Sequence, residues 1–290
     1  MELHQLRYFL AVVDEGTFTA AAHAVRVSQS GISTQLQKLE RELGVALVDR
    51  STRRVALTPA GARLVPYARA ALAAVAEVGA AADDIRGLVT GSLRIGTVSG
   101  LLWPPLFDAI SDIHAAHPGV DLRLREGTSD DLISGVQDGS IDVAVAAWAD
   151  AAPEDVATAV IVDDPLVAVV ADRHPWRARS SIEPRELDRT DLIVRPAGPG
   201  ARQALDGVLG RVGSRRIPRW EAATPAFIQM LASRGVGVGV VSATTARGWT
   251  GITVIPIADP EARSRLGVVW RESPDHATRA LLDRLPVGSS

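Results

Sequence analysis

A short run early in the chain, RVSQSGISTQLQKLERELG at residues 26–44, separates uncharged polar side chains from aliphatic ones. Four aliphatic residues follow the i, i+4, i+7, i+11 spacing of a buried helix face: Ile32, Leu36, Leu39 and Leu43. Five polar residues fall outside that stripe: Gln29, Ser30, Ser33, Thr34 and Gln37. Glutamine can make two hydrogen bonds to adenine, and serine and threonine bind several bases or phosphate. Such side chains fit readout of DNA bases, and the alternative is a surface helix that they merely solvate. The segments on either side of this helix decide between the two.

The segments before this helix are typical of a helix-turn-helix. Residues 3–13 place apolar side chains at helical spacing, Gly16 breaks that helix, and Thr17 can cap a short second helix. Ser28 is the natural N-cap of the third helix, and Gly44 ends it. In a helix-turn-helix, the later of the two helices enters the major groove with its N-terminal residues near base edges. Here that is the third helix of the chain, which begins after Ser28. We therefore add Thr17 and Ser28 to the predicted DNA-binding residues.

Two short β-prone runs come next, ALVDR and RVALT, and they flank the turn-like STR. This order predicts a hairpin with Arg50, Arg53 and Arg54 near its tip. Beside a recognition helix the hairpin would be a wing, and its arginines would hold the phosphate backbone.

A long helix is predicted after the hairpin. Thr58 and Pro59 supply an N-cap and a first-turn proline, and the helical pattern continues to about Gly87, interrupted only by Pro66. Such a helix is about 40 Å long. It is rich in Ala and Val without a core of its own nearby, so we expect it to pack on a partner helix. The stripe expected at that contact is Leu64, Tyr67, Ala68, Ala71, Leu72, Val75 and Val78.

From residue 92 onward, strand-like runs alternate with helical segments. The runs are LRIGTV, DLRLRE, IDVAVAAW, PLVAVVA, DLIVR, VGVGVV, ITVIPI and RLGVVWRE. This alternation is typical of a sheet covered by helices. We expect two α/β units rather than one, because residues 163–165 and 259–261 have the character of crossing points.

Composition narrows the classes of function. The 290 residues carry 31 Lys and Arg against 34 Asp and Glu, so DNA binding has to rest on a local basic patch. Cysteine is absent, which excludes disulfides, thiol catalysis and Cys-based zinc sites. No apolar run is long enough for a membrane span, and the first residues lack the features of a secretion signal. The cytoplasm is therefore the expected compartment.

Motifs for catalysis are missing as well. The six histidines are scattered, and His114 with His117 would supply only two metal ligands. The GVGVGV run lacks the G-x-G-x-x-G spacing, and neither G-x-S-x-G nor a P-loop is present. We therefore expect no catalytic residue, no metal and no cofactor. A transport solute-binding protein would share the second half of the chain, but the first 90 residues argue against it.

The N-terminal part closely resembles the winged helix-turn-helix of LysR-type transcriptional regulators. LRYFLAVVDEGTFTAAA, VSQSGISTQLQKLERELGVALVDR and RRVALTPAG carry this resemblance, and GSLRIGT, GSIDVAVA, HPW and GVGVGVV extend it in the right order. It implies a mixed fold with a DNA-binding domain at 1–58, a linker and dimerisation helix at 59–87, and an α/β effector-binding domain at 88–290. The effector domain would have two subdomains of periplasmic-binding-protein type, 91–162 with 265–290 and 163–264.

The resemblance also implies where a small effector binds, in a cleft between those subdomains. The residues carried over are Thr97, Ser99, Gly100, Leu101, Trp103, Thr128, Trp148, Arg195, Gly198, Pro199, Thr224 and Phe227. Amides at a helix N-terminus, hydroxyls and Arg195 would suit a carboxylate, and the aromatic rings would suit an apolar body. An organic acid is therefore the expected effector.

The implied function is sequence-specific regulation of transcription, in a direction that the sequence does not give. The implied partners are double-stranded DNA with an imperfect inverted repeat, a small-molecule effector, RNA polymerase, and further copies of the chain in a homodimer or homotetramer. No membrane partner is expected.

Overall fold

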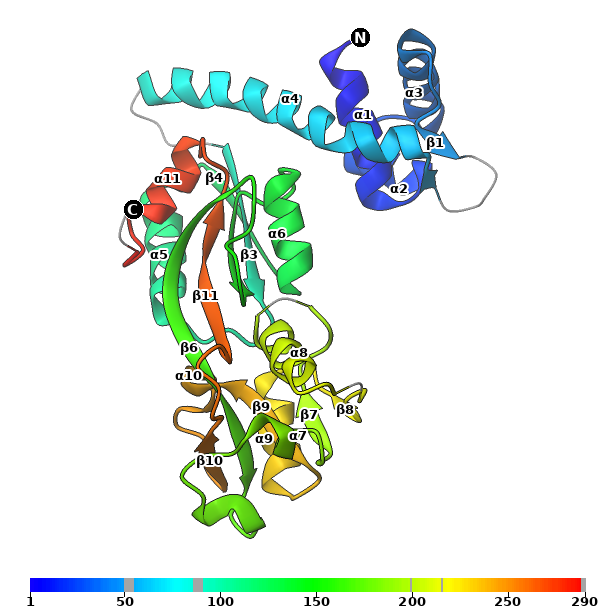
Figure 1. Ribbon diagram of the computed structural model, residues 1–290. Coiled ribbons are helices and arrows are strands. Elements are labelled where there is room, and N and C mark those ends of the chain that lie inside the picture. Colours follow the sequence, from blue (N-terminus) through cyan, green and yellow to red (C-terminus); the bar gives the residue numbers. More distant parts are fainter. Residues whose placement is uncertain (50–54, 86–90, 199, 215, 288–290) are drawn as a thin grey trace. The chain divides into compact units, whose positions relative to one another are not determined.

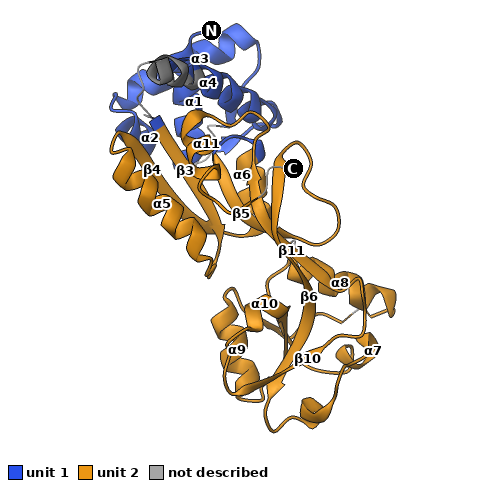
Figure 2. Cartoon of the chain, turned by 90° about the vertical axis from the view of Figure 1, so that its left-hand side faces the viewer, with its two compact units in different colours: residues 1–91, 137–140 blue, residues 92–136, 141–290 orange. Residues whose placement is uncertain are grey.

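The computed structural model describes residues 1–49, 55–85, 91–198, 200–214 and 216–287 (Figure 1). The chain divides into two compact units, and each is described by itself (Figure 2). One unit comprises residues 1–91 with 137–140, and the other comprises 92–136 with 141–290. None of the described helices has the length and apolar character that a membrane span requires.

The first unit begins with α1 (Leu3–Glu15), α2 (Phe18–Ala24) and α3 (Gln29–Leu43). The predicted caps are confirmed, because the hydroxyls of Thr17 and Ser28 accept backbone N–H groups three residues on, at 3.2 and 3.0 Å. Gly16 ends α1 in the left-handed region, at φ 67°, which glycine adopts without strain. The predicted stripe on α3 is fully buried except at its end, where Leu43 is 37% exposed because the helix outlasts the core.

The predicted hairpin is confirmed at its base. Strands β1 (Val48–Asp49) and β2 (Ala56–Leu57) pair antiparallel, with Val48 opposite Leu57. The predicted tip residues Arg50, Arg53 and Arg54 lie outside the described residues.

The predicted long helix is also confirmed, as α4 (Pro59–Ile85) with Pro66 inside it. The Thr58 hydroxyl caps it by accepting the N–H of Gly61 at 2.9 Å. Its apolar stripe divides into two parts. Ala68 is buried in the core of its own unit, and Leu64, Ala71 and Leu72 pack against that core. Further along the helix the side chains of Val75 and Val78 are exposed.

The second unit contains two subdomains built on one path of strands in the order β4-β3-β5-β11-β6-β9-β7-β8, with β10 paired to β6. Subdomain I contains β3 (Gly91–Val98), α5 (Pro104–Ala116), β4 (Val120–Gly127), α6 (Ser129–Gln137), β5 (Val143–Trp148), β11 (Arg263–Trp270) and α11 (His276–Leu282). Strand β3 runs parallel to β5, and β11 pairs antiparallel with β5.

Subdomain II lies beyond the middle of β6 (Ala157–Ala171). Its elements are η1 (Pro175–Ala178), α7 (Pro184–Leu187), β7 (Leu192–Val194), α8 (Ala201–Arg211), β8 (Trp220–Glu221), α9 (Pro225–Ser233), β9 (Val238–Ser242), α10 (Ala243–Ala246) and β10 (Ile252–Pro256). Core clusters lie on both faces of its sheet, against α8 on one side and α9 on the other.

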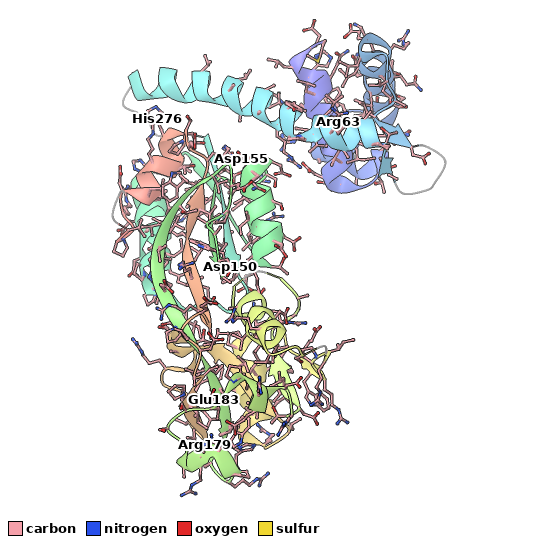
Figure 3. All side chains as sticks on the ribbon, viewed as in Figure 1. Arg63, Asp150, Asp155, Arg179, Glu183 and His276 are labelled. Atoms are coloured by element: carbon pink, nitrogen blue, oxygen red, sulfur yellow. The ribbon has the colours of Figure 1, made fainter. Side chains whose placement is uncertain are left out.

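The first crossing between the subdomains is a continuous strand. Strand β6 pairs with β11 as far as Pro165 and with β9 from Leu166 onward (Figure 1). Arg265 on β11 donates to the carbonyl oxygen of Asp150 at 2.6 Å, and Asp150 lies where the two subdomains meet (Figure 3). The crossing is therefore held by sheet pairing rather than by a free linker.

Candidate nucleic-acid interface and ligand cleft

The exposed face of α3 carries the polar side chains that the sequence singles out. Gln29, Ser30, Thr34 and Gln37 are exposed, and Ser33 is partly exposed. This placement follows from the helical period, because the aliphatic stripe buries the opposite side. The face offers amide and hydroxyl groups that donate and accept hydrogen bonds, which is the chemistry of base-edge readout.

Two of the predicted residues have a structural role. The Thr17 and Ser28 hydroxyls are the caps of α2 and α3, and the Ser28 and Ser30 hydroxyl oxygens lie 3.2 Å apart. A capping hydroxyl satisfies an N–H at the start of a helix and fixes the direction in which the helix emerges. These two residues therefore position the polar face.

Basic residues that were not among the predicted ones border this face. Arg26 occupies the turn between α2 and α3 at φ 55°, and its side chain is exposed. Lys38 and Arg41 are exposed on α3 itself. The signal for Lys38 and Arg41 in the sequence was their spacing on the helix outside the aliphatic stripe. Together they supply the local positive charge that the overall charge of −3 does not.

A carboxylate joins the base of the wing to the recognition helix. Glu40 Oε1 accepts the backbone N–H groups of Leu47 and Val48, at 2.8 and 3.3 Å. Val48 begins β1, so the first strand of the wing is fixed against α3 by its own backbone. The contact sets where the hairpin starts relative to the polar face.

In the second unit, the loop after β3 meets the start of α9 across the junction of the subdomains. Gly100 has φ +76°, and a Cβ built there would lie 3.1 Å from Cδ of Pro225 and 4.0 Å from Cβ of Thr224. A side chain at position 100 would therefore be strained and would press on subdomain II. The structure thus brings predicted residues Gly100 and Thr224 together.

A second approach between the subdomains involves Asp130 at the start of α6. A Cβ built at Gly198, where φ is +146°, would lie 3.3 Å from a carboxylate oxygen of Asp130. Thr128 lies just before α6, and its hydroxyl donates to Asp131 at 2.7 Å and accepts the Asp131 N–H at 3.2 Å. Predicted residues Thr128 and Gly198 therefore flank the same junction.

Arg195 is a positively charged group at this junction. It follows β7 and is half-buried, and its Nη1 donates to the carbonyl oxygen of Ser99 at 3.4 Å. Burial lowers the pKa of the Arg195 guanidinium from its ordinary value, although an arginine keeps its charge in a protein. A half-buried cation with one long hydrogen bond favours an anionic partner. Arg195 thus joins Ser99 across the two subdomains.

The aromatic residues predicted for the cleft are placed differently from one another. Phe227 lies in the first turn of α9 and is 61% exposed, and Trp103 is the partly exposed N-cap of α5. Trp148 is 3% exposed within the core of subdomain I, where its ring fills the space beside Gly267. The ring of Trp148 therefore does not line a surface for a ligand, because its place in the middle of the sheet commits it to the core.

The remaining predicted residues complete the set. Thr97 is 2% exposed on β3, and Leu101 is partly exposed beside Gly100. Pro199 lies outside the described residues. Within the described part of the chain, no group of three or more His, Cys, Asp or Glu is arranged to hold a metal ion.

Comparisons with known proteins match the N-terminal part of the chain to a DNA-binding domain and the rest to a ligand-binding domain. Residues 3–62 match the bacterial regulatory helix-turn-helix of the lysR family, and residues 86–286 match the LysR substrate binding domain. The chain therefore belongs to the LysR family of DNA-binding transcriptional regulators and is not an enzyme. The predicted fold class is confirmed.

Individual relatives cover nearly the whole chain. The HTH-type transcriptional regulator YnfL of Escherichia coli K12 is 31% identical over 277 residues, which are 93% of this chain and 92% of that protein. A probable hydrogen peroxide-inducible genes activator of Mycobacterium avium is 32% identical over 275 residues, 92% of this chain and 87% of that protein. The structure of a full-length OxyR variant from Pseudomonas aeruginosa is 25% identical and has a TM-score of 0.75, covering 100% of this chain and 98% of that one.

Proposed function

We propose that α3 reads base edges in the major groove while the wing holds the phosphate backbone. The observation that supports this is the exposed polar face of α3 beside Arg26, Lys38 and Arg41. Predicted wing residues Arg50, Arg53 and Arg54 would add contacts to phosphate. A protein that works on chromosomal DNA acts in the cytoplasm, which we propose as its location.

Gln29 is the residue that tests this arrangement. Gln29→Ala should weaken specific binding by about 1–3 kcal/mol and relax the preference at one base step, because it removes a bidentate contact. Gel shifts on the DNA upstream of the protein's own gene, with single-base variants, measure both effects. Gln203→Ala is the matched control, since Gln203 is exposed on α8 in the other unit. Unchanged sequence preference in Gln29→Ala would show that the register of α3 on DNA is wrong.

We further propose that the chain acts as a homodimer or a homotetramer on an imperfect inverted repeat. Two copies related by a two-fold axis would present two recognition helices to two half-sites. The exposed apolar side chains of Tyr67, Val75 and Val78 on α4 support this, because the described residues of their own unit do not cover them. RNA polymerase would be the further partner of such an assembly.

For the effector we propose a small organic acid bound between the two subdomains. Half-buried Arg195, facing Ser99, supports a carboxylate, and exposed Phe227 supports an apolar body. Some relatives are named for hydrogen peroxide, but peroxide oxidises cysteine thiols and this sequence contains none. An organic ligand therefore suits this chain better than peroxide.

Arg195 tests the effector proposal. A thermal-shift screen of the full chain against organic acids should find a stabilising compound, because a ligand that binds the folded state raises its stability. Arg195→Gln should remove most of that shift while leaving DNA affinity without ligand unchanged. A shift of the same size in Arg195→Gln would place the ligand elsewhere.

A further inference from the structure

Charged side chains of both signs lie around the loop that follows β3 at the junction of the subdomains. Glu126 lies one residue before the end of β4 and Asp130 lies in the first turn of α6, both in subdomain I. From subdomain II, Arg195 contacts Ser99, whose neighbour Gly100 is bound by Glu126, and Gly198 approaches Asp130. Asp131 adds a third carboxylate, which already accepts the Thr128 hydroxyl. Arg202 nearby is not available to a ligand, because its guanidinium is bound by two further carboxylates of its own subdomain. A ligand with negative charge alone would therefore meet repulsion as well as attraction.

Glu126 also accepts a hydrogen bond from a backbone amide that an anionic ligand would need. Its Oε1 accepts the backbone N–H of Gly100 at 3.3 Å, in the loop that precedes α5. A ligand carboxylate directed to that amide would have to displace a carboxylate of the protein itself. Arg195, whose Nη1 makes only a 3.4 Å bond to a carbonyl, remains the better place for it.

Asp130 provides a negative charge that could bind a positively charged group at the other end of a ligand. Its carboxylate oxygen lies against the backbone at Gly198, and no hydrogen bond or ion pair joins it to another described residue. A carboxylate in such a place binds an ammonium group more strongly than a neutral donor. Glu126, an exposed side chain with one long hydrogen bond, can do the same.

We propose that the effector of this cleft is amphoteric, with a carboxylate for Arg195 and an ammonium group for Glu126 and Asp130. An amino acid or a close derivative has this chemistry. The inference rests on the proposed function of the cleft and narrows the organic acid to one that also carries a positive charge. It accounts for the three charged groups together, which a simple carboxylic acid does not.

Matched pairs of compounds test this proposal on the full chain. The twenty protein amino acids are screened by thermal shift, and calorimetry compares each hit with the same acid lacking the 2-amino group, such as L-phenylalanine against 3-phenylpropanoate. At least one amino acid should bind, and it should bind about tenfold or more tighter than its deaminated partner, since a charge-assisted bond is lost. The amine lacking the carboxylate should also bind more weakly.

Two substitutions assign the preference to named residues. Glu126→Gln keeps an acceptor for the Gly100 amide and removes the charge, and Asp130→Asn does likewise for its site. Each should reduce the ratio between the paired compounds severalfold. Asp121→Asn is the control, because Asp121 lies on the same strand and pairs with Arg123 on the surface at 2.9 Å. The control should keep the ratio of the original chain.

The outcomes distinguish the proposal of an amphoteric ligand from the broader proposal of an organic acid bound by Arg195. If a deaminated acid binds as tightly as its amino acid, the amphoteric ligand is wrong while the organic acid stands. The same conclusion follows if Glu126→Gln and Asp130→Asn both leave the ratio unchanged. If neither series binds, or if amines bind as tightly as amino acids, the role of Arg195 fails and both proposals fall.

Discussion

At the scale of single residues, Glu40 shows how one side chain can position a whole wing. The two N–H groups that it accepts belong to Leu47, just before β1, and to Val48, the first residue of β1. A backbone donor that loses its acceptor costs free energy unless water replaces it. The geometry of the wing therefore depends on a residue that never has to touch DNA.

Glu40→Ala should lower the free energy of unfolding by about 1–3 kcal/mol, because two backbone donors lose a charged acceptor. It should also weaken DNA binding to all sequences alike, since the wing would no longer be held beside α3. Urea unfolding and gel shifts measure the two effects. Glu40→Gln retains an acceptor oxygen and should lose clearly less of both. Equal losses in the two variants would mean that the hydrogen bonds at Oε1 are not what matters.

At the scale of elements, α4 changes its role along its length. Its first turns are part of the core of the first unit, where Val65 and Ala68 are buried. Later turns expose Val75 and Val78, and Val78 is 72% exposed. An apolar helix face without a partner in its own unit is typical of an interface. Substitutions at Val75 and Val78 therefore test dimerisation without disturbing the core of the first unit.

Val75→Asp combined with Val78→Asp should shift the chain toward monomer and remove cooperative binding to the two half-sites. The reason is that an unpaired charge in an apolar interface costs several kcal/mol. Light scattering reports the mass, and gel shifts on one or two half-sites report cooperativity. Ala70→Asp is the control, because Ala70 is exposed on α4 outside the stripe. Leu72→Asp is unsuitable, since Leu72 packs on its own unit and the change would also disturb folding. An unaltered mass in the double variant would rule out this interface.

Elements whose signal is local could be predicted from the sequence. Caps at Thr17 and Ser28 and the buried stripe of α3 depend on residues within one or two turns, so spacing alone was enough. The role of Trp148 could not be predicted, because its burial comes from β11 pairing beside β5, more than a hundred residues later in the chain. That β6 continues through Pro165 could not be predicted either, because Pro165 pairs with Arg263 on the same distant strand. The charges around Arg195 became visible only when the fold brought both subdomains together.

At the scale of the whole ligand-binding unit, the two subdomains are coupled through β6 and β11. Asp163 on β6 accepts Nε of Arg263 at 2.8 Å and Nε of Arg265 at 3.2 Å, both from β11. Leu166 donates its N–H to the carbonyl of Ala262 at 2.6 Å. A hinge motion that opens or closes a cleft here must strain these contacts, so they set the balance between the two forms. A ligand can shift that balance only through unequal affinity for them.

Asp163→Ala should loosen this crossing and speed amide hydrogen exchange at Leu166 and Arg263 relative to the rest of β6. The three charged side chains are partly exposed, so the loss in local stability should be no more than about 1 kcal/mol, roughly a fivefold change in exchange. High salt should bring the original chain toward the variant, because screening weakens exposed ion pairs. Asp121→Ala removes a surface pair elsewhere in the same subdomain and should leave exchange at the crossing unchanged. If exchange at Leu166 responds neither to Asp163→Ala nor to salt, the backbone pairing of β6 alone holds the subdomains, and the ion pairs play no part in their closure.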